Sequence, residues 1–272
     1  MHSRDDRTWA PRVIAHRGDS AHAPENTAPA FDRALEVGAD GIELDLQLSR
    51  DGVVVIYHDH KLAKLGLRSR HIRDYDWAQL ALRDAGVWRG PEFAETRILT
   101  LAQVLEGWAP RTRLLLEIKA YGRNRQGSRD LLLARKAAQM LAELPATALD
   151  NIRVLSFSAA VLDTVAETLH EAGLLPPRLV RNLATPAELE RTRAAQLATY
   201  AACCVNIDAF VPEQVRRVHR AGLRLYAYTV DSEAQIRCAH ALGCSVLICN
   251  DPALVRERVQ ALALPEAAVL AD

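Results

Sequence analysis

Residues 41–59, GIELDLQLSRDGVVVIYHD, decide the fold of this 272-residue chain because they predict two strands joined by a tight turn. Polar and apolar side chains alternate over residues 42–48, which is typical of a strand whose two faces meet different surroundings. Asp51 and Gly52 favour a hairpin turn because this dipeptide accepts the positive φ angles that such turns require. The apolar, β-branched run 53–57 then predicts the returning strand.

This hairpin would bring ionisable side chains together. Glu43, Asp45 and Gln47 share one face of the first strand, because successive side chains of a strand point to opposite sides. His58 lies opposite Asp45 if two residues form the loop, and opposite Glu43 if the loop is two residues longer. Both registers leave the imidazole on the carboxylate face, whereas a shift of one residue would turn it away.

Strand and helix patterns alternate along the rest of the chain. Apart from the returning arm of the hairpin, eight strands are expected, at residues 12–16, 41–48, 113–119, 152–157, 178–181, 203–207, 223–228 and 245–249. The first helix is expected to end at Val37, with Asn26 or Thr27 as its N-terminal cap. Further helices are expected at residues 101–108 and 128–144, and others are expected to start near Ala159, Pro186, Pro212, Ser232 and Pro252. Eight parallel strands that each precede a helix close into a (β/α)8 TIM barrel.

The alternatives to a closed barrel fit the pattern less well. A barrel that also included residues 53–57 would have nine strands. An open doubly wound sheet remains conceivable, but no glycine-rich phosphate-binding turn follows the first strand. Residues 60–97 show little periodicity and are interpreted as an insertion. We therefore expect residues 1–272 to form a single barrel domain with a short insertion after the hairpin on the second strand.

The composition restricts the classes of partner. Lysine plus arginine and aspartate plus glutamate both number 34, so the overall charge does not favour nucleic acid or an anionic membrane. No apolar run is long enough to span a membrane, and the N-terminal residues lack the apolar core of a signal peptide. The five cysteines lack metal-type spacing and are interpreted as buried thiols in a reducing compartment. A cytoplasmic protein without stable membrane insertion is expected, and the oligomeric state stays open.

Chemically active side chains gather at the carboxyl ends of the expected strands, which all meet on one face of a barrel. The first three barrel strands supply His16, Glu43, Asp45, Glu117 and Lys119. The later strand ends supply mainly hydroxyls, amides and an arginine, namely Ser156, Arg181, Asn206 or Asp208, Tyr228 or Thr229, and Asn250 with Asp251.

Three carboxylates in one site require a compensating positive charge. Two unit charges about 4 Å apart repel by roughly 4 kcal/mol at an effective dielectric constant of 20. Oxygen ligands from Glu43, Asp45 and Glu117, without a cysteine, indicate one hard divalent cation, Mg²⁺ or Ca²⁺. The alternative is a salt-bridge network of the three acids with Lys119, Arg17 and Arg181.

Two histidines beside such a cluster suggest proton transfer. Imidazole titrates near neutral pH, so that one of His16 and His58 can accept a proton while the other donates one. Arg17 offers a planar fork suited to phosphate oxygens, and Lys119 adds a point charge. Together these groups are typical of attack on a phosphodiester. His60 is a weaker candidate for the site.

Several motifs, in order and spacing, resemble the glycerophosphodiester phosphodiesterase family. They are His16-Arg17-Gly18, Pro24-Glu25-Asn26-Thr27, Gly38-Ala39-Asp40-Gly41-Ile42-Glu43-x-Asp45, Asp51-Gly52, His58-Asp59 and Leu116-Glu117-Ile118-Lys119, and Ser156-Phe157 and Asn250-Asp251-Pro252 continue the match. Residues 60–97 correspond to the insertion of that family. The resemblance therefore covers most of the chain.

The resemblance implies a (β/α)8 barrel that hydrolyses glycerophosphodiesters to glycerol 3-phosphate and an alcohol. It implies His16 and His58 as the general acid-base pair, Glu43, Asp45 and Glu117 as metal ligands, and phosphate binding by Arg17 and Lys119. It also implies attack by the glycerol hydroxyl of the substrate, which gives a cyclic phosphate that water then opens.

Departures from the family pattern leave the alcohol open. Tyr228 stands where a tryptophan is frequent, Ser49 stands where threonine is usual, and the insertion is short and basic. A lysophospholipase D-like activity, with the basic-apolar residues 61–73 facing a bilayer, is one alternative. A non-catalytic barrel that binds phosphodiesters is another.

Overall fold

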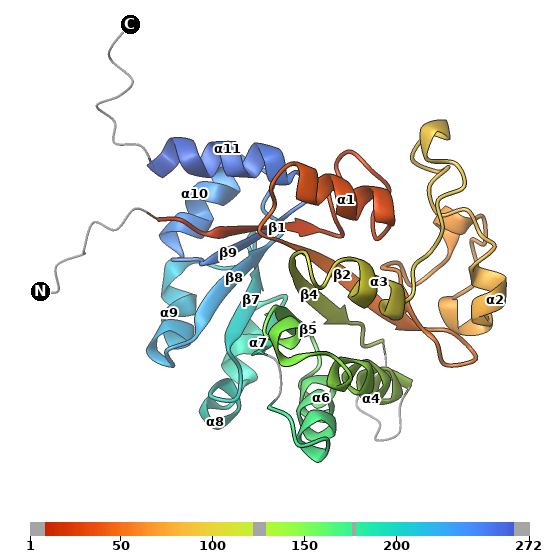
Figure 1. The fold of residues 1–272 in the computed structure, drawn as a ribbon. Coiled ribbons are helices and arrows are strands. Elements are labelled where there is room, and N and C mark those ends of the chain that lie inside the picture. Colours follow the sequence, from red (N-terminus) through yellow and green to blue (C-terminus); the bar gives the residue numbers. More distant parts are fainter. Residues whose placement is uncertain (1–8, 122–128, 176–177, 264–272) are drawn as a thin grey trace, which may run out of the picture.

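The computed structural model describes residues 9–121, 129–175 and 178–263, and within them eight parallel strands close into a barrel (Figure 1). Closure is direct, because the first strand pairs in parallel with both the second and the last. The strands are β1 (Arg12–His16), β2 (Gly41–Leu48), β3 (Val54–Ile56), β4 (Arg113–Ile118), β5 (Ile152–Ser156), β6 (Arg178–Leu183), β7 (Ala202–Asn206), β8 (Arg224–Tyr228) and β9 (Val246–Cys249). Only β3 among them is antiparallel, so the expected (β/α)8 barrel with an added hairpin arm is confirmed.

Helices surround the strands, and each barrel strand precedes at least one of them (Figure 1). The longer helices are α1 (Ala28–Glu36), α3 (Leu101–Gly107), α4 (Arg129–Ala142), α6 (Ala159–Glu171), α7 (Pro186–Arg191), α9 (Pro212–Arg220), α10 (Glu233–Ala241) and α11 (Pro252–Ala263). Single turns form α2 (Trp77–Leu80), α5 (Ala146–Leu149), α8 (Ala194–Leu197), and the 3₁₀ helices η1 (Ala63–Leu65), η2 (Ile72–Asp74) and η3 (Pro91–Phe93). The expected helix starts are confirmed, except that Ser128 lies outside the described residues.

The register of the hairpin differs from both expected registers. Leu48 pairs with Val54 and Leu46 with Ile56, so that three residues, 50–52, form the loop. This is the one-residue shift that was expected to turn His58 away. A three-residue loop needs one left-handed residue rather than two, and Gly52 supplies it with a φ of 84°.

His58 nevertheless reaches the site, because the strand ends before it. The amide of Tyr57 still donates to the carbonyl of Asp45 at 2.9 Å, and the chain then leaves the sheet. Gln47 Nε2 donates to the carbonyls of Tyr57, His58 and Asp59 at 2.9, 3.2 and 3.0 Å. This amide, and not the alternation of a strand, therefore fixes the segment that carries the imidazole.

The loop after β1 is held close to α1 by a glycine. A Cβ on Gly18 would lie 2.6 Å from the carbonyl carbon and oxygen of Ala30, and its φ is 81°. Both facts exclude a larger side chain without backbone movement. The preceding Arg17 also has a positive φ, 59°, which directs the chain back over the barrel end.

The insertion, residues 60–97, has a small core of its own. Leu62, Leu65, Ile72 and Leu80 are buried there and pack with Val55 and Tyr57. Within residues 61–73, the side chains of Leu62, Leu65 and Ile72 are thus turned inward, and most of the charged side chains are exposed to solvent. No helix of the described residues is both long and apolar enough to cross a bilayer.

Candidate active site

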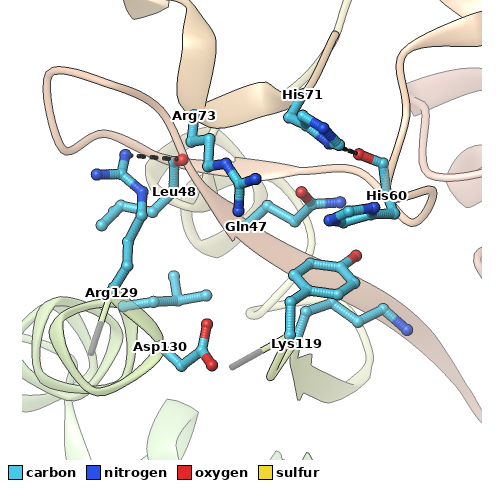
Figure 2. A pocket seen from close by; sticks show the side chains of 10 residues that line it. Gln47, Leu48, His60, His71, Arg73, Lys119, Arg129 and Asp130 are labelled. Carbon is cyan, nitrogen blue, oxygen red and sulfur yellow. Dashed lines mark hydrogen bonds between the residues drawn. The ribbon is translucent and has the colours of Figure 1, made fainter. Parts of the chain in front are cut away.

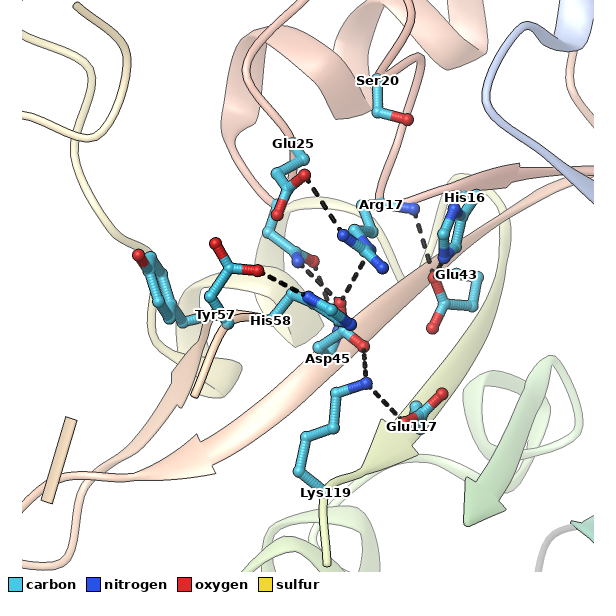
Figure 3. Close-up of polar contacts among 12 residues, drawn as sticks. His16, Arg17, Ser20, Glu25, Glu43, Asp45, Tyr57, His58, Glu117 and Lys119 are labelled. Atoms are coloured by element: carbon cyan, nitrogen blue, oxygen red, sulfur yellow. Dashed lines mark hydrogen bonds and ion pairs between the residues drawn. The ribbon is translucent and has the colours of Figure 1, made fainter. Parts of the chain in front are cut away.

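Two adjacent strands place three carboxylates together at the carboxyl end of the barrel (Figure 3). Glu43 and Asp45 lie on β2, and Glu117 lies on β4 as the register partner of Asp45. One carboxylate oxygen from each residue lies within 4.8 Å of those of the other two. Glu43 and Asp45 are only 2% and 1% exposed, so their charges lie in a region of weak solvent screening.

Asp45 is the carboxylate with the most cationic neighbours. Its Oδ1 lies 2.7 Å from Lys119 Nζ, and its Oδ2 lies 3.3 Å from Arg17 Nε. Asn26 Nδ2 donates to the same Oδ2 at 2.8 Å. Burial alone would raise the pKa of Asp45, but Lys119 and Arg17 outweigh it and hold the pKa well below its usual range.

Glu43 lacks that compensation. Its Oε2 accepts a hydrogen bond from the backbone amide of Arg17 at 3.2 Å and lies 3.9 Å from His16 Nε2. Within residues 9–121, 129–175 and 178–263, no lysine or arginine side chain forms an ion pair with it. Burial, followed by the charges of Asp45 and Glu117, raises the pKa of Glu43 well above its usual value.

The salt-bridge alternative is therefore only partly realised. Lys119 Nζ reaches Glu117 Oε1 at 2.5 Å as well as Asp45, and Arg17 contributes as described. Arg181, by contrast, donates to the carbonyls of Ser156 and Asn182 at 3.2 and 2.9 Å. Burial still raises the pKa of Glu117 despite Lys119. A buried set of oxygen donors with uncompensated negative charge fits Mg²⁺ or Ca²⁺.

His16 lies beside this cluster and is fixed by a residue from the other end of the chain. Its Nδ1 is 2.7 Å from Asn250 Oδ1. The amide group of Asn250 donates to Asp231 Oδ2 at 2.6 Å, so its oxygen faces His16 and Nδ1 carries the proton. Burial, and then Arg17, lowers the pKa of His16 to about 3. The imidazole is therefore neutral at pH 7, with the lone pair of Nε2 on the side of Glu43.

His58 has an acidic partner instead. Its Nδ1 lies 2.9 Å from Asp59 Oδ1 (Figure 3). Lys64 Nζ lies 3.1 Å from Asp59 Oδ2. The hydrogen bond from His58, followed by Lys64, lowers the pKa of Asp59 to about 2. Lys64 also lies 2.8 Å from Glu25 Oε1. The insertion thus contributes a side chain to the support of His58.

Some of these supporting residues could be found from the sequence and others could not. Asn250 follows a strand directly, as expected of a site residue, whereas Asp231 lies three residues beyond the end of β8. Asp231 would be among the candidate site residues if the three residues after each expected strand were included. No sequence pattern indicated a role for Lys64, because the insertion that contains it has no periodicity from which its position could be predicted.

The remaining strand-end candidates do not join the acidic cluster. Ser156 donates to the carbonyl of Ile118 at 2.9 Å, and Asn206 Oδ1 accepts from the amide of Asp208. Tyr228 packs edge-on against Phe157. His60 lies outside the cluster as well, with its ring 4.8 Å from that of Tyr121.

Two cavities are lined by residues that contact or lie beside the cluster. One, of about 400 Å³, lies beyond Lys119 and is lined by Gln47, Tyr121 and residues of the insertion and α4 (Figure 2). The other, of about 630 Å³, is more open and is lined by His16, Arg17 and Asn250. A substrate with two unlike halves joined at a central group would fit this arrangement.

Comparison with known proteins gives a consistent result. The sequence profile described as the Glycerophosphoryl diester phosphodiesterase family matches residues 16–254. The glycerophosphodiester phosphodiesterase of Caldanaerobacter subterraneus subsp. tengcongensis is 29% identical over 242 residues, which cover 88% of this chain and 94% of that protein. A glycerophosphodiester phosphodiesterase of Bacillus subtilis is 28% identical over 254 residues, 89% of this chain and 84% of its own length.

A solved structure matches the whole barrel. It is a phosphodiesterase from Oleispira antarctica in complex with the product sn-glycerol-3-phosphate, 25% identical, with a TM-score of 0.77. The superposition covers 94% of this chain and 99% of that one.

Proposed function

Because the chain belongs to the glycerophosphoryl diester phosphodiesterase family, we propose that it hydrolyses glycerophosphodiesters to glycerol 3-phosphate and an alcohol. The geometry of Glu43, Asp45 and Glu117 supports this proposal most directly, since one oxygen of each lies within 4.8 Å of the others. The product bound to the Oleispira relative is of the same class. The likeness to catalytic relatives also argues against a barrel that merely binds phosphodiesters.

Glu43, Asp45 and Glu117 would hold one divalent cation, Mg²⁺ or Ca²⁺. When bound, such a cation neutralises charge that develops on the phosphoryl oxygens. The support for it is Glu43, whose negative charge has no lysine or arginine partner among the described side chains, although Asp45 and Glu117 have Lys119.

His16 and His58 would move the protons. His16 is neutral at pH 7, so its Nε2 accepts the proton of the entering hydroxyl as the new bond to phosphorus forms. His58, whose Nδ1 is fixed by Asp59, donates a proton to the alcohol oxygen as its bond to phosphorus breaks. Arg17 and Lys119 supply fixed positive charge beside the phosphoryl oxygens. The entering hydroxyl belongs to water or to the glycerol of the substrate itself.

Removal of one carboxylate charge tests the metal site. Glu43→Gln, Asp45→Asn and Glu117→Gln should each abolish divalent-dependent release of glycerol 3-phosphate, because each removes one of the three anionic oxygen ligands. Glu106→Gln, on the exposed face of α3, is the matched control and should retain full activity. Full wild-type activity in excess chelator would contradict the proposal, provided that circular dichroism shows each variant folded.

The five cysteines support a reducing compartment such as the cytoplasm. All five are free thiols, and four of them, Cys203, Cys204, Cys244 and Cys249, are buried. We place the enzyme there, in the turnover of glycerol and lipid-derived phosphodiesters, with a small molecule as its partner. Growth of cells that depend on this enzyme for their supply of glycerol 3-phosphate, compared with and without the enzyme, would test that role.

A further inference from the structure

We propose that the cavity of about 400 Å³ beyond Lys119 receives the alcohol half of the substrate and favours an alcohol that carries a negatively charged group. This inference rests on the proposed phosphodiesterase function. It concerns the part of the substrate that the departures from the family pattern leave open.

The cavity lies close to where the proposed leaving oxygen of the substrate would be. Lys119 lines the cavity while its Nζ contacts Asp45 and Glu117. Tyr121, another wall residue, donates from its hydroxyl to the backbone carbonyl of His58 at 2.9 Å. A group in this cavity therefore lies next to the segment that carries His58, the proposed proton donor to the alcohol.

The second cavity is suited to the other half of the substrate. In displacement at phosphorus the entering and leaving oxygens lie roughly in line, so the two halves of a diester extend in different directions. Arg17 and Lys119 approach different oxygens of Asp45, from opposite sides in Figure 3. The cavity on the Arg17 side is lined by Ser20, Asp231 and Asn250, which offer partners for glycerol hydroxyls.

The charges around the first cavity favour an anion. Among the described residues, its walls carry three permanent cations, Arg73, Lys119 and Arg129, and one carboxylate, Asp130. Lys119 and Arg129 are engaged, since Arg129 donates to the carbonyls of Leu48 and Ser49. A quaternary ammonium alcohol would add a fourth cation to this space.

Arg73 is the side chain that is available to a ligand. Within the described part of the chain its guanidinium makes no hydrogen bond or ion pair. Figure 2 shows it pointing across the cavity near Gln47, opposite Asp130. A guanidinium in this position can bind a phosphate or carboxylate with two parallel hydrogen bonds. The rings of His60 and Tyr121 and the side chain of Leu133 provide an adjoining less polar wall.

Three substrates with the same glycerol half test this assignment. They are glycerophosphoglycerol, whose alcohol is neutral, glycerophosphocholine, whose alcohol is cationic, and glycerophosphoglycerol phosphorylated on its distal glycerol. Loss of the diester is followed by phosphorus NMR with the wild-type protein, Arg73→Gln and Arg83→Gln. Arg83, an exposed arginine of the same insertion that does not line the cavity, is the matched control.

We expect wild-type kcat/KM for the phosphorylated substrate to exceed that for glycerophosphocholine at least about tenfold, the scale of a charge-assisted contact. Arg73→Gln should lower the first value about fivefold and change the value for glycerophosphoglycerol less than about twofold. Arg83→Gln should change neither. Preference for glycerophosphocholine, or an equal effect of Arg73→Gln on every substrate, overturns the inference alone. Absence of turnover of all three substrates by the wild-type protein overturns the proposed function as well.

Discussion

Lys64 belongs to the insertion, yet its ammonium lies between two carboxylates of the active site. It is 2.8 Å from Glu25 and 3.1 Å from Asp59, and it also lies 4.8 Å from the ring centre of Trp88. Asp59 in turn fixes Nδ1 of His58 at 2.9 Å. Lys64 thus acts on the imidazole through Asp59, which makes it a positioning residue.

Lys64→Met should therefore lower kcat about fivefold to tenfold, because it loosens the proposed proton donor, and should change KM less, although Lys64 also lines the cavity on the Arg17 side. Steady-state kinetics on glycerophosphoglycerol would measure both constants. Lys61→Met, at an exposed position three residues earlier, should behave as the wild type. A change confined to KM would instead place Lys64 in substrate binding.

His16 gives a pH-dependent contribution to stability. Its pKa in the folded chain is about 3, below the ordinary value of 6.5, so between these values the unfolded state binds more protons than the folded state. Folding stability must then rise with pH across this window and fall as the pH is lowered from 6.5 towards 3.

For metal-free protein in excess chelator, the wild type should lose about 1–2 kcal/mol more stability than His16→Gln between pH 7 and pH 5. Urea unfolding at the two pH values measures this difference. Other carboxyl groups titrate in both proteins and largely cancel in the comparison. Equal losses in the two proteins would show that His16 is not held neutral by burial.

At the level of elements, the strands were predictable and the hairpin register was not. The barrel strands are buried runs such as residues 113–118 and 246–249. Their apolar composition and spacing can be recognised in the sequence without knowledge of the residues that pack against them. The loop length of the hairpin depends instead on Gly52 alone adopting a left-handed conformation, which the dipeptide signal does not specify. The segment after β3 is fixed by the side-chain amide of Gln47, a contact across the hairpin that no local sequence pattern indicates.

Gly52→Ala should destabilise the protein by about 1–2 kcal/mol, because an L-residue is disfavoured at a φ of 84°. Its Cβ would also lie 3.1 Å from Cε of Lys136. Gly107→Ala, at the end of α3 with no heavy atom within 4 Å of its Cβ, should leave stability unchanged or slightly higher. Thermal unfolding would compare the two, and similar shifts in both variants would contradict the strain at Gly52.

At the level of the whole molecule, the barrel predicted from strand counting also predicted which residues meet. His16, Glu43 and Glu117 lie on neighbouring barrel strands, so the parallel pairing of β1, β2 and β4 was sufficient to bring them together. The sequence could not predict which of the carboxylates the neighbouring cations would neutralise. Lys119 contacts two acids and leaves Glu43 uncompensated, and this depends on side-chain geometry within a few ångströms.

Asn250, which orients His16, is 234 residues away from it in the chain. β9, which directly precedes Asn250, also closes the barrel against β1. During synthesis His16, the proposed proton acceptor, therefore emerges from the ribosome long before the residue that aligns it. A nascent fragment that stops short of β9 would lack both the strand that closes the barrel and the contact that orients the proposed base.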